Sequence, residues 1–328
     1  MSAQVKNIGN GNKRKFGKTL RLQWQLLLMS IPMLLYILLF AYVPLAGWVM
    51  AFQNFRPRFG LTPIQQIMNS EFVGLAHFRT LLDMNTIFGQ RFIQSVINTI
   101  GQSFLTLVLG FICTIGLSLM LHEVRQLGIK RVIQNILYLP HFLSWVIVAL
   151  LASVALSLPA SGGYINSFLM WIGIINNPIH FLARPGYFWG IVAGTHLWKN
   201  IGWNTIIYMA AMTAIDPTLY EAASIDGANR YHKMWHITLA SIKPTIVLLL
   251  IINIGFLLTS GFEIQWFLGH GVNVSRSENI DIFILRYGLQ MFNFSLATAA
   301  GILRTFVSIL FLLTANFIAR ISKQETLF

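Results

Sequence analysis

Long apolar runs separated by short polar connections dominate the chain from residue 26 onward. A helix that crosses the hydrocarbon core of a bilayer needs about 20 apolar residues. Six runs qualify, from Leu26 to Ala51, Phe92 to Leu121, Ile133 to Leu158, Tyr187 to Ile215, Thr245 to Phe262, and Phe294 to Ala319. Because lipid offers no partner to an open sheet edge, such spans are helical. The pattern predicts an all-α polytopic membrane protein with six transmembrane helices.

Composition supports a membrane location. Of the 328 residues, 55% are hydrophobic and 10% are charged, whereas soluble domains carry about 25% charged residues. The net charge of +13 does not indicate nucleic-acid binding, because the basic residues do not interleave with aromatic residues in a soluble segment. The single cysteine, Cys113, cannot form an internal disulfide.

The basic residues predict the orientation in the membrane. With both termini inside, the inner connections hold about twice as many Lys and Arg residues as the outer ones, as the positive-inside rule requires. We expect three parts: a basic cytoplasmic tail over residues 1–25, a membrane domain over 26–320, and a cytoplasmic tail over 321–328. The outer side then receives residues 53–91, 159–186 and 263–293.

The inner connection between the fourth and fifth spans is unusually polar and predicts a helical hairpin at about residues 216–242. Asp216 and Pro217 suit a helix start, and Gly227 can adopt the left-handed conformation that ends a helix. A second helical segment is expected from Asn229 to Leu239. The first helix, about 15 Å long, is too short to be stable alone in water and needs a partner surface.

The composition of this hairpin favours docking to another protein. Ala222 and Ala223 let a second backbone approach closely, and Glu221 and Asp226 offer negative charge to a basic partner. The alternative is a solvated loop that only joins two spans.

The hairpin resembles the EAA loop of the membrane subunits of binding-protein-dependent ABC importers. That family carries Glu-Ala-Ala, then Gly four positions after the second Ala, then Ile-x-Leu-Pro. The positions that match are Glu221, Ala222, Ala223, Gly227, Ile237 and Leu239. Ala240 stands where the family usually has Pro, so the exit of the hairpin is expected to differ.

The resemblance implies the type I importer permease fold, in the bacterial cytoplasmic (inner) membrane, with the hairpin as coupling helix. It also implies a second homologous permease subunit, two ATPase subunits and an extracytoplasmic solute-binding protein. ATP and Mg would bind the ATPase subunits, with no cofactor on this chain. Segments near both ends are similar to permeases of oligosaccharide importers, including those for alginate and other acidic polysaccharide fragments.

Polar residues recur along the fourth span at helical spacing: His196, Lys199, Asn200, Trp203 and Asn204. This spacing places them on one helical face. A Lys inside a span usually faces a water-filled cavity, where Lys199 could meet a uronate carboxylate and Trp203 could stack on a sugar ring. The alternative is that the stripe packs against a partner subunit while Lys199 reaches the outer interface.

Other spans add scattered polar and aromatic residues. They include Ser95, Asn98, Gln102, Thr106, Tyr138, His141, Trp145, Asn253, Thr259, Ser260 and Arg304. We include Trp145 and Arg304 among the candidate pathway residues, although each such residue is more often interhelical contact than ligand. Gly190 and Gly194 form a GxxxG pair, which is typical of close helix packing.

The sequence offers no sign of an enzyme. It lacks a Walker-type glycine loop, metal-ligand spacing and a catalytic triad. Two alternatives to a non-catalytic importer subunit stay open: a stand-alone secondary transporter, which often shows paired broken helices, and a membrane enzyme acting on lipid-linked sugar.

Overall fold

A computed structural model describes residues 23–58, 60–258 and 261–321. The expected tails, 1–25 and 321–328, lie almost wholly outside these ranges. The helices of the first half are α2 Trp24–Ile37, η1 Leu38–Tyr42, η2 Val43–Phe52, α3 Pro63–Met68, α4 Ala76–Leu82, α5 Ile87–Glu123, α6 Leu127–Tyr138, η3 Leu139–Phe142, α7 Trp145–Ala155, η4 Pro159–Ser161 and α8 Tyr164–Trp171. Those of the second half are η5 Phe181–Ala183, η6 Pro185–Tyr187, α9 Phe188–Thr213, α10 Pro217–Ile225, α11 Arg230–Lys233, η7 Met234–Thr238, α12 Leu239–Ser241, α13 Lys243–Gly255, α14 Glu263–Leu268, α15 Val274–Ser277, α16 Ile280–Leu285, η8 Arg286–Gln290 and α17 Phe294–Ile321.

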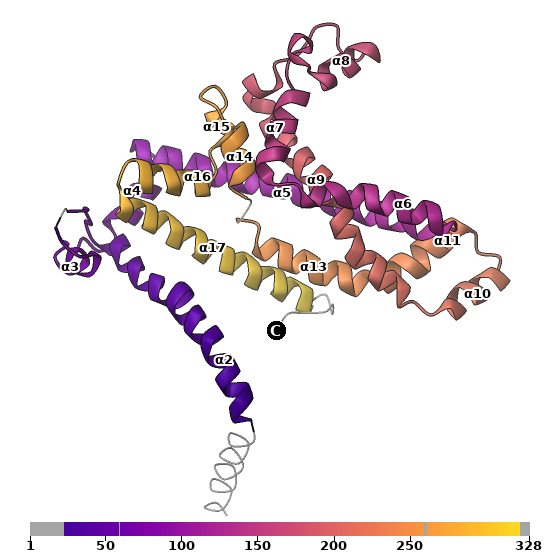
Figure 1. Cartoon of the computed structure of the whole chain (residues 1–328), viewed down its shortest axis with the longest axis horizontal. Coiled ribbons are helices and arrows are strands. Elements are labelled where there is room, and N and C mark those ends of the chain that lie inside the picture. Colours follow the sequence, from indigo (N-terminus) through magenta and orange to yellow (C-terminus); the bar gives the residue numbers. More distant parts are fainter. Residues whose placement is uncertain (1–22, 59, 259–260, 322–328) are drawn as a thin grey trace, which may run out of the picture.

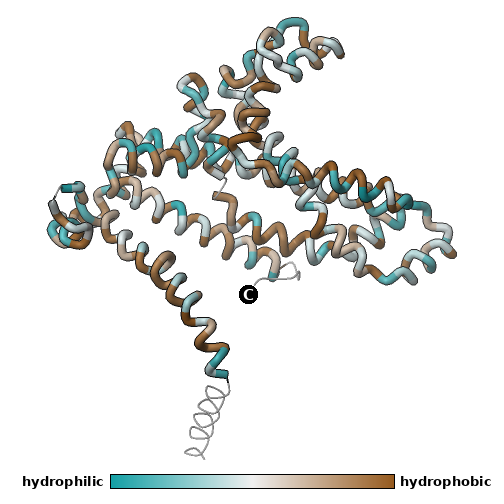
Figure 2. The backbone as a smooth tube through the Cα atoms, viewed as in Figure 1, coloured by the Kyte–Doolittle hydropathy of each residue, from teal (hydrophilic) through white to brown (hydrophobic). Residues whose placement is uncertain are grey.

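The predicted all-α class is confirmed, since the described residues contain only one isolated β-bridge besides the helices. The 37 residues of α5 give a rod about 55 Å long. Helix α9 lies alongside it, α6 packs against α9, and α13 and α17 form a second row (Figure 1). Helix α2 departs from this body at an angle (Figure 1) and is mostly hydrophobic in the view of Figure 2; none of its residues is buried.

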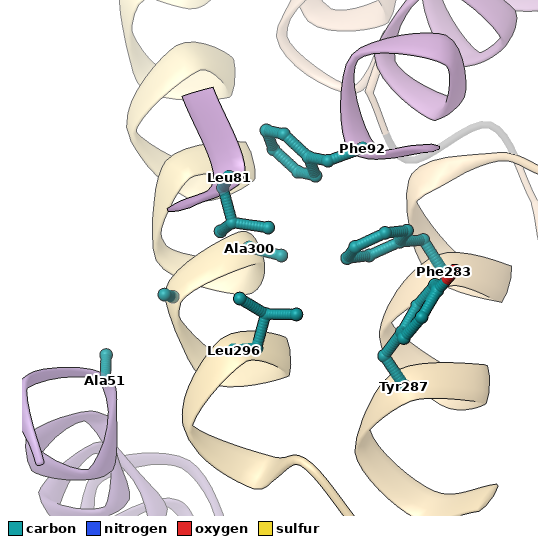
Figure 3. Packing of buried hydrophobic residues seen from close by; sticks show 8 residues of the cluster. Ala51, Leu81, Phe92, Phe283, Tyr287, Leu296 and Ala300 are labelled. Carbon is teal, nitrogen blue, oxygen red and sulfur yellow. The ribbon is translucent and has the colours of Figure 1, made fainter. Parts of the chain in front are cut away.

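A cluster of buried apolar residues lies at the end of the body where α5 and α17 begin. Phe92 from α5, Phe283 from α16 and Leu296 from α17 converge there (Figure 3). The rings of Phe92 and Phe283 meet edge to face with centroids 5.5 Å apart, a favoured aromatic arrangement. Leu81 from α4 is also fully buried in this cluster, so the connection before α5 is anchored to the body.

Three described helical segments are long and apolar enough to cross a membrane: 24–52, α5 and α17. Two bent pairs, α6 with α7 and residues 230–241 with α13, raise the number to five if each pair is one span. Helix α9 has 26 residues, but it is not among these candidates. Its His, Lys and Asn residues lower its hydropathy.

The third predicted span is not one continuous helix. Its two halves, α6 and α7, meet at an angle of 103°. Pro140 cannot donate a backbone hydrogen bond and lies in the tight turn η3. Ser144 then starts the new helix, because its Oγ accepts a hydrogen bond from the backbone N–H of Ile147 at 3.4 Å.

The fifth predicted span, Thr245 to Phe262, also ends early. Helix α13 stops at Gly255 after 13 residues, a length of about 20 Å. The expected outer segment after it is well packed rather than loose: Ile264 and Leu268 of α14 are buried against α7 and the start of α9.

Candidate transport pathway and coupling hairpin

A cavity of about 470 Å³ lies between α5, α7, α9, α13 and α14. Its polar lining comes from the amides, hydroxyls and imidazole of Gln102, Ser103, Thr106, Thr114, His196, Asn200, Asn204, Tyr208, Asn253 and Gln265. Apolar groups such as Phe111, Trp145 and Phe256 complete it. None of the lining residues that the structure describes is Asp, Glu, Lys or Arg. The cavity is therefore polar without a fixed charge.

Three buried polar atoms of this lining have no hydrogen-bond partner among the described residues. They are Ser103 Oγ, Thr114 Oγ1 and His196 Nε2. An unpaired buried polar group costs about 1–3 kcal/mol. Water or a hydroxyl-bearing ligand in the cavity would satisfy these groups.

The polar stripe of α9 divides into two faces. His196, Asn200 and Asn204, which are four residues apart, line the cavity. Lys199 and Trp203 do not belong to the lining and lie against the bend between α6 and α7. The sequence spacing placed all five on one side of the helix. With 3.6 residues per turn, however, residues three and four positions apart point in slightly different directions. One part of the stripe can therefore face the cavity while the other part contacts a neighbouring element.

Lys199 is bound to the protein backbone. Its Nζ donates hydrogen bonds to the carbonyl oxygens of His141 and Leu143, each at 2.6 Å, and lies 5.2 Å from the centre of the Trp145 ring. Its side chain is buried, with 6% of the residue exposed. Lys199 therefore holds the carbonyls that the α6–α7 break leaves without helical partners, and it does not face the cavity.

Aromatic contacts complete the attachment of α9 to the bend. The Trp203 ring stacks on His141 with centroids 4.5 Å apart and planes 5° apart. His141 Nδ1 also lies 3.1 Å from Asn200 Oδ1. On the cavity side, Trp145 packs against His196 with centroids 4.4 Å apart. Trp145 thus lines the cavity, whereas Trp203 has a ring partner within the chain.

Arg304 is also engaged within the chain. It forms an ion pair with Asp281 of α16, and its Nε donates to the carbonyl of Leu258 at 3.1 Å. It is not among the cavity-lining residues. Its role in the structure is to join α17 to α16 and to the end of the α13 segment.

The predicted hairpin lies at one extremity of the molecule, past the last residues of α5 (Figure 1). Asp216 Oδ1 accepts a hydrogen bond from the Thr218 N–H at 2.9 Å, which lowers the pKa of that carboxyl below its usual range. Gly227 has a φ of 74°, the left-handed conformation that ends α10. Asn229 then caps the next helix by accepting from the N–H of His232 at 2.9 Å.

Side-chain contacts fix the two arms of the hairpin to each other and to α5. Lys233 Nζ donates to Ser224 Oγ at 2.5 Å, and Tyr220 Oη lies 2.9 Å from Thr238 Oγ1. Arg230 pairs with Glu123, the last residue of α5, at 3.2 Å. The second arm continues through Ala240 as α12, and the chain bends by 56° before α13.

The outer surface of the hairpin has no partner within the described residues. Glu221, Ala222, Asp226 and Gly227 are exposed, and Ala223 is half-buried. Ile225 is 87% exposed. A short helix that presents an apolar side chain between two carboxylates is suited to a protein partner with a basic rim.

Sequence comparison decides the family. Residues 106–326 match the family described as binding-protein-dependent transport system inner membrane component. The chain belongs to this family. The matched range contains α9, the hairpin and most of the cavity lining, so the permease's two candidate sites both lie within the family's common region.

Relatives cover nearly the whole permease. It is 40% identical over 306 residues to the polygalacturonan/rhamnogalacturonan transport system permease protein YteP of Bacillus subtilis, covering 93% of this chain and 91% of the relative. Protein LplB of the same organism is 36% identical over 303 residues, covering 92% and 91%. A crystal structure of a bacterial ABC transporter that imports the acidic polysaccharide alginate matches with a TM-score of 0.81 and 36% identity, covering 93% of this chain and 98% of that one.

These findings confirm the type I importer permease fold and a multi-pass, non-catalytic inner membrane subunit of an ABC importer. They disfavour both alternatives, the secondary transporter and the lipid-linked-sugar enzyme. A further solved structure shows an alginate ABC transporter in complex with a substrate-bound periplasmic protein, with a TM-score of 0.82 and 36% identity, covering 94% of this chain and 99% of that one.

Several cavity residues were not singled out from the sequence. Ser103 and Thr114 share a helical face with Thr106, and extending that stripe along α5 would have found them. Tyr208 continues the α9 series by one turn. Gln265 gave no such signal, because its segment was expected to be an outer connection; in the structure it donates to Gln102 Oε1 at 3.2 Å.

Proposed function

We propose that this permease forms half of the translocation pathway for an oligosaccharide that carries carboxylate groups. Two observations support the proposal. The cavity presents amides, hydroxyls and unpartnered polar atoms beside aromatic rings, which suits the hydroxyls and apolar faces of sugars. Two of the proteins named above serve polygalacturonan and rhamnogalacturonan, and alginate, which are all acidic.

The proposed assembly contains a second homologous permease subunit, two ATPase subunits that bind ATP and Mg, and an extracytoplasmic solute-binding protein. Both termini lie in the cytoplasm, as the distribution of Lys and Arg favours. The hairpin then faces the ATPase subunits, and Glu221 to Gly227 form the part that docks. The segments at the opposite end receive the loaded binding protein.

The hairpin is connected to the cavity by short routes. Helix α9 ends at Thr213, with two residues between it and the Asp216 cap, and it supplies His196, Asn200 and Asn204 to the cavity. The Arg230–Glu123 pair links the hairpin to α5, which supplies the facing hydroxyls. Closure of the ATPase pair would therefore move both walls of the cavity together, as alternating access requires.

The test is uptake by the complete transporter in proteoliposomes. We expect ATP-dependent uptake of tetragalacturonate by the wild type. Replacement of Asn200 and Asn204 by Ala should lower uptake about 5- to 150-fold, since each lost hydrogen bond to cargo is worth about 0.5–1.5 kcal/mol. Asn316→Ala, outside the cavity lining, is the control. Wild-type uptake by the double variant would overturn the cavity as pathway, and absence of tetragalacturonate uptake by the wild type would overturn the cargo class.

A further inference from the structure

An acidic cargo needs a positive group somewhere along its path, and the cavity has none among its described lining residues. The two cations expected from the sequence are engaged elsewhere, Lys199 with backbone carbonyls and Arg304 with Asp281. A positive group that binds the carboxylates must therefore lie outside the cavity.

Two arginines near the start of α5, Arg91 and Arg286, are already engaged in ion pairs. Arg91 and Arg286 both pair with the buried Glu278, at 3.6 and 2.8 Å. Arg276 differs. It forms no ion pair within the described ranges, it is exposed, and its guanidinium carbon lies 4.7 Å from the centre of the Trp189 ring.

Arg276 lies one hydrogen bond away from the cavity. Its carbonyl oxygen accepts from Gln102 Nε2 at 2.9 Å and from Trp189 Nε1 at 3.2 Å. Gln102 is part of the cavity lining, and Val192, one turn after Trp189 on α9, is part of it as well. The arginine therefore occupies the rim of the cavity.

The rim is rigid, which matters for recognition. Asn98 Nδ2 donates to the carbonyl of Ser275 at 3.0 Å, and Asn273 Nδ2 donates to that of Leu182 at 2.9 Å. The Trp189 ring lies against Gly101, where a Cβ would come within 2.4 Å of it. The backbone and the aromatic platform of Arg276 are thus fixed before any ligand arrives, which reduces the entropy lost on binding.

We propose that Arg276, held on Trp189, binds a uronate carboxylate at the rim while the neutral cavity binds the hydroxyls of the same chain. This inference rests on the proposed function. A guanidinium can donate two parallel hydrogen bonds to a carboxylate, and stacking on an aromatic face leaves those donors free. Arg276 at the rim then selects cargo that carries a carboxylate. The cavity selects cargo by the shape and the hydroxyl groups of the sugar.

The experiment compares tetragalacturonate with its fully methyl-esterified, neutral form in proteoliposomes containing the complete transporter. Cargo concentrations are set so that the binding protein is equally loaded with each tetramer. Arg276→Gln should lower initial uptake of the acidic tetramer about tenfold, the loss expected for one charge-assisted hydrogen-bonded contact, and leave the esterified tetramer unchanged. Trp189→Leu should give a smaller loss in the same direction.

Arg184→Gln is the matched control, because Arg184 is another exposed arginine on the neighbouring segment without an ion pair among the described residues. It should leave both uptake rates unchanged. Equal losses for both tetramers in Arg276→Gln would mean that the arginine docks the binding protein, and would overturn this inference while leaving the proposed function intact. If the wild type imported neither tetramer, the proposed function would fail, and this inference with it.

Discussion

Lys199 lies buried in the middle of α9, where its ammonium group donates hydrogen bonds to the carbonyl oxygens of His141 and Leu143. A lysine within a span predicts a polar neighbourhood, and Lys199 has one. The sequence did not show that this neighbourhood is the broken backbone between α6 and α7. Free carbonyls at a helix break and a cargo carboxylate are both good partners for an ammonium group. The residue type alone therefore could not show which of the two Lys199 contacts.

The structure therefore predicts that Lys199→Met destabilises the permease without changing its preference for acidic cargo. The substitution leaves buried carbonyls without a donor, at a cost of about 1–3 kcal/mol each. Thermal unfolding in nanodiscs should show a clear loss of stability, while the ratio of acidic to esterified tetramer uptake should stay at the wild-type value. Lys243→Met, at an exposed lysine, should unfold like the wild type. A selective loss of acidic uptake in Lys199→Met would return this residue to the pathway.

At the scale of elements, the sequence was most successful where one regular helix crosses without interruption. The spans that became α5 and α17 were predicted from apolar length alone, and the hairpin from its cap residues and Gly227. The bend of the third span was not predicted, because Pro140 is tolerated inside many membrane helices. The contacts of Lys199, Trp203 and His141 stabilise the break there.

Glycines illustrate the same limit. The GxxxG pair Gly190 and Gly194 suggested close helix packing, but a Cβ at either position would meet no atom within 4 Å in the described residues. The close approach occurs instead at Gly202, where a Cβ would lie 2.0 Å from the carbonyl oxygen of Leu137. A motif indicates that a helix can pack closely, but not which neighbour it meets.

Gly202→Ala should accordingly separate α9 from α6 and destabilise the permease by about 1–3 kcal/mol, the usual cost of overpacking. Gly194→Ala, on the same helix but in open space, should be neutral or slightly stabilising, since Ala restricts the unfolded chain more than Gly does. Thermal unfolding of both variants in nanodiscs gives the comparison. Equal behaviour of the two would contradict the close contact between α6 and α9.

For the whole molecule, the important relation is between its two ends. The helices α5 and α9 line the cavity and are also joined to the hairpin, so a displacement of the hairpin reaches α9 through a connection of only two residues. The sequence predicted the hairpin and the polar stripe separately. Their mechanical connection depends on the Arg230–Glu123 pair and on the two-residue connection between α9 and Asp216.

This connection makes the geometry of Gly227 testable as a coupling element. Its φ of 74° costs a β-branched residue more than the roughly 1–2 kcal/mol typical of side chains in this conformation, although a Cβ there would meet no atom within 4 Å. Gly227→Val should therefore alter the direction in which α10 is presented and lower the amount of cargo imported per ATP hydrolysed. Gly227→Asn adds a side chain of similar bulk but tolerates the left-handed conformation, so it should couple nearly as well as the wild type. Uptake and ATP hydrolysis measured in the same proteoliposomes give the ratio. If the two variants behaved alike, backbone conformation at Gly227 would have no part in coupling, and the docking role would have to rest on the exposed charges of Glu221 and Asp226.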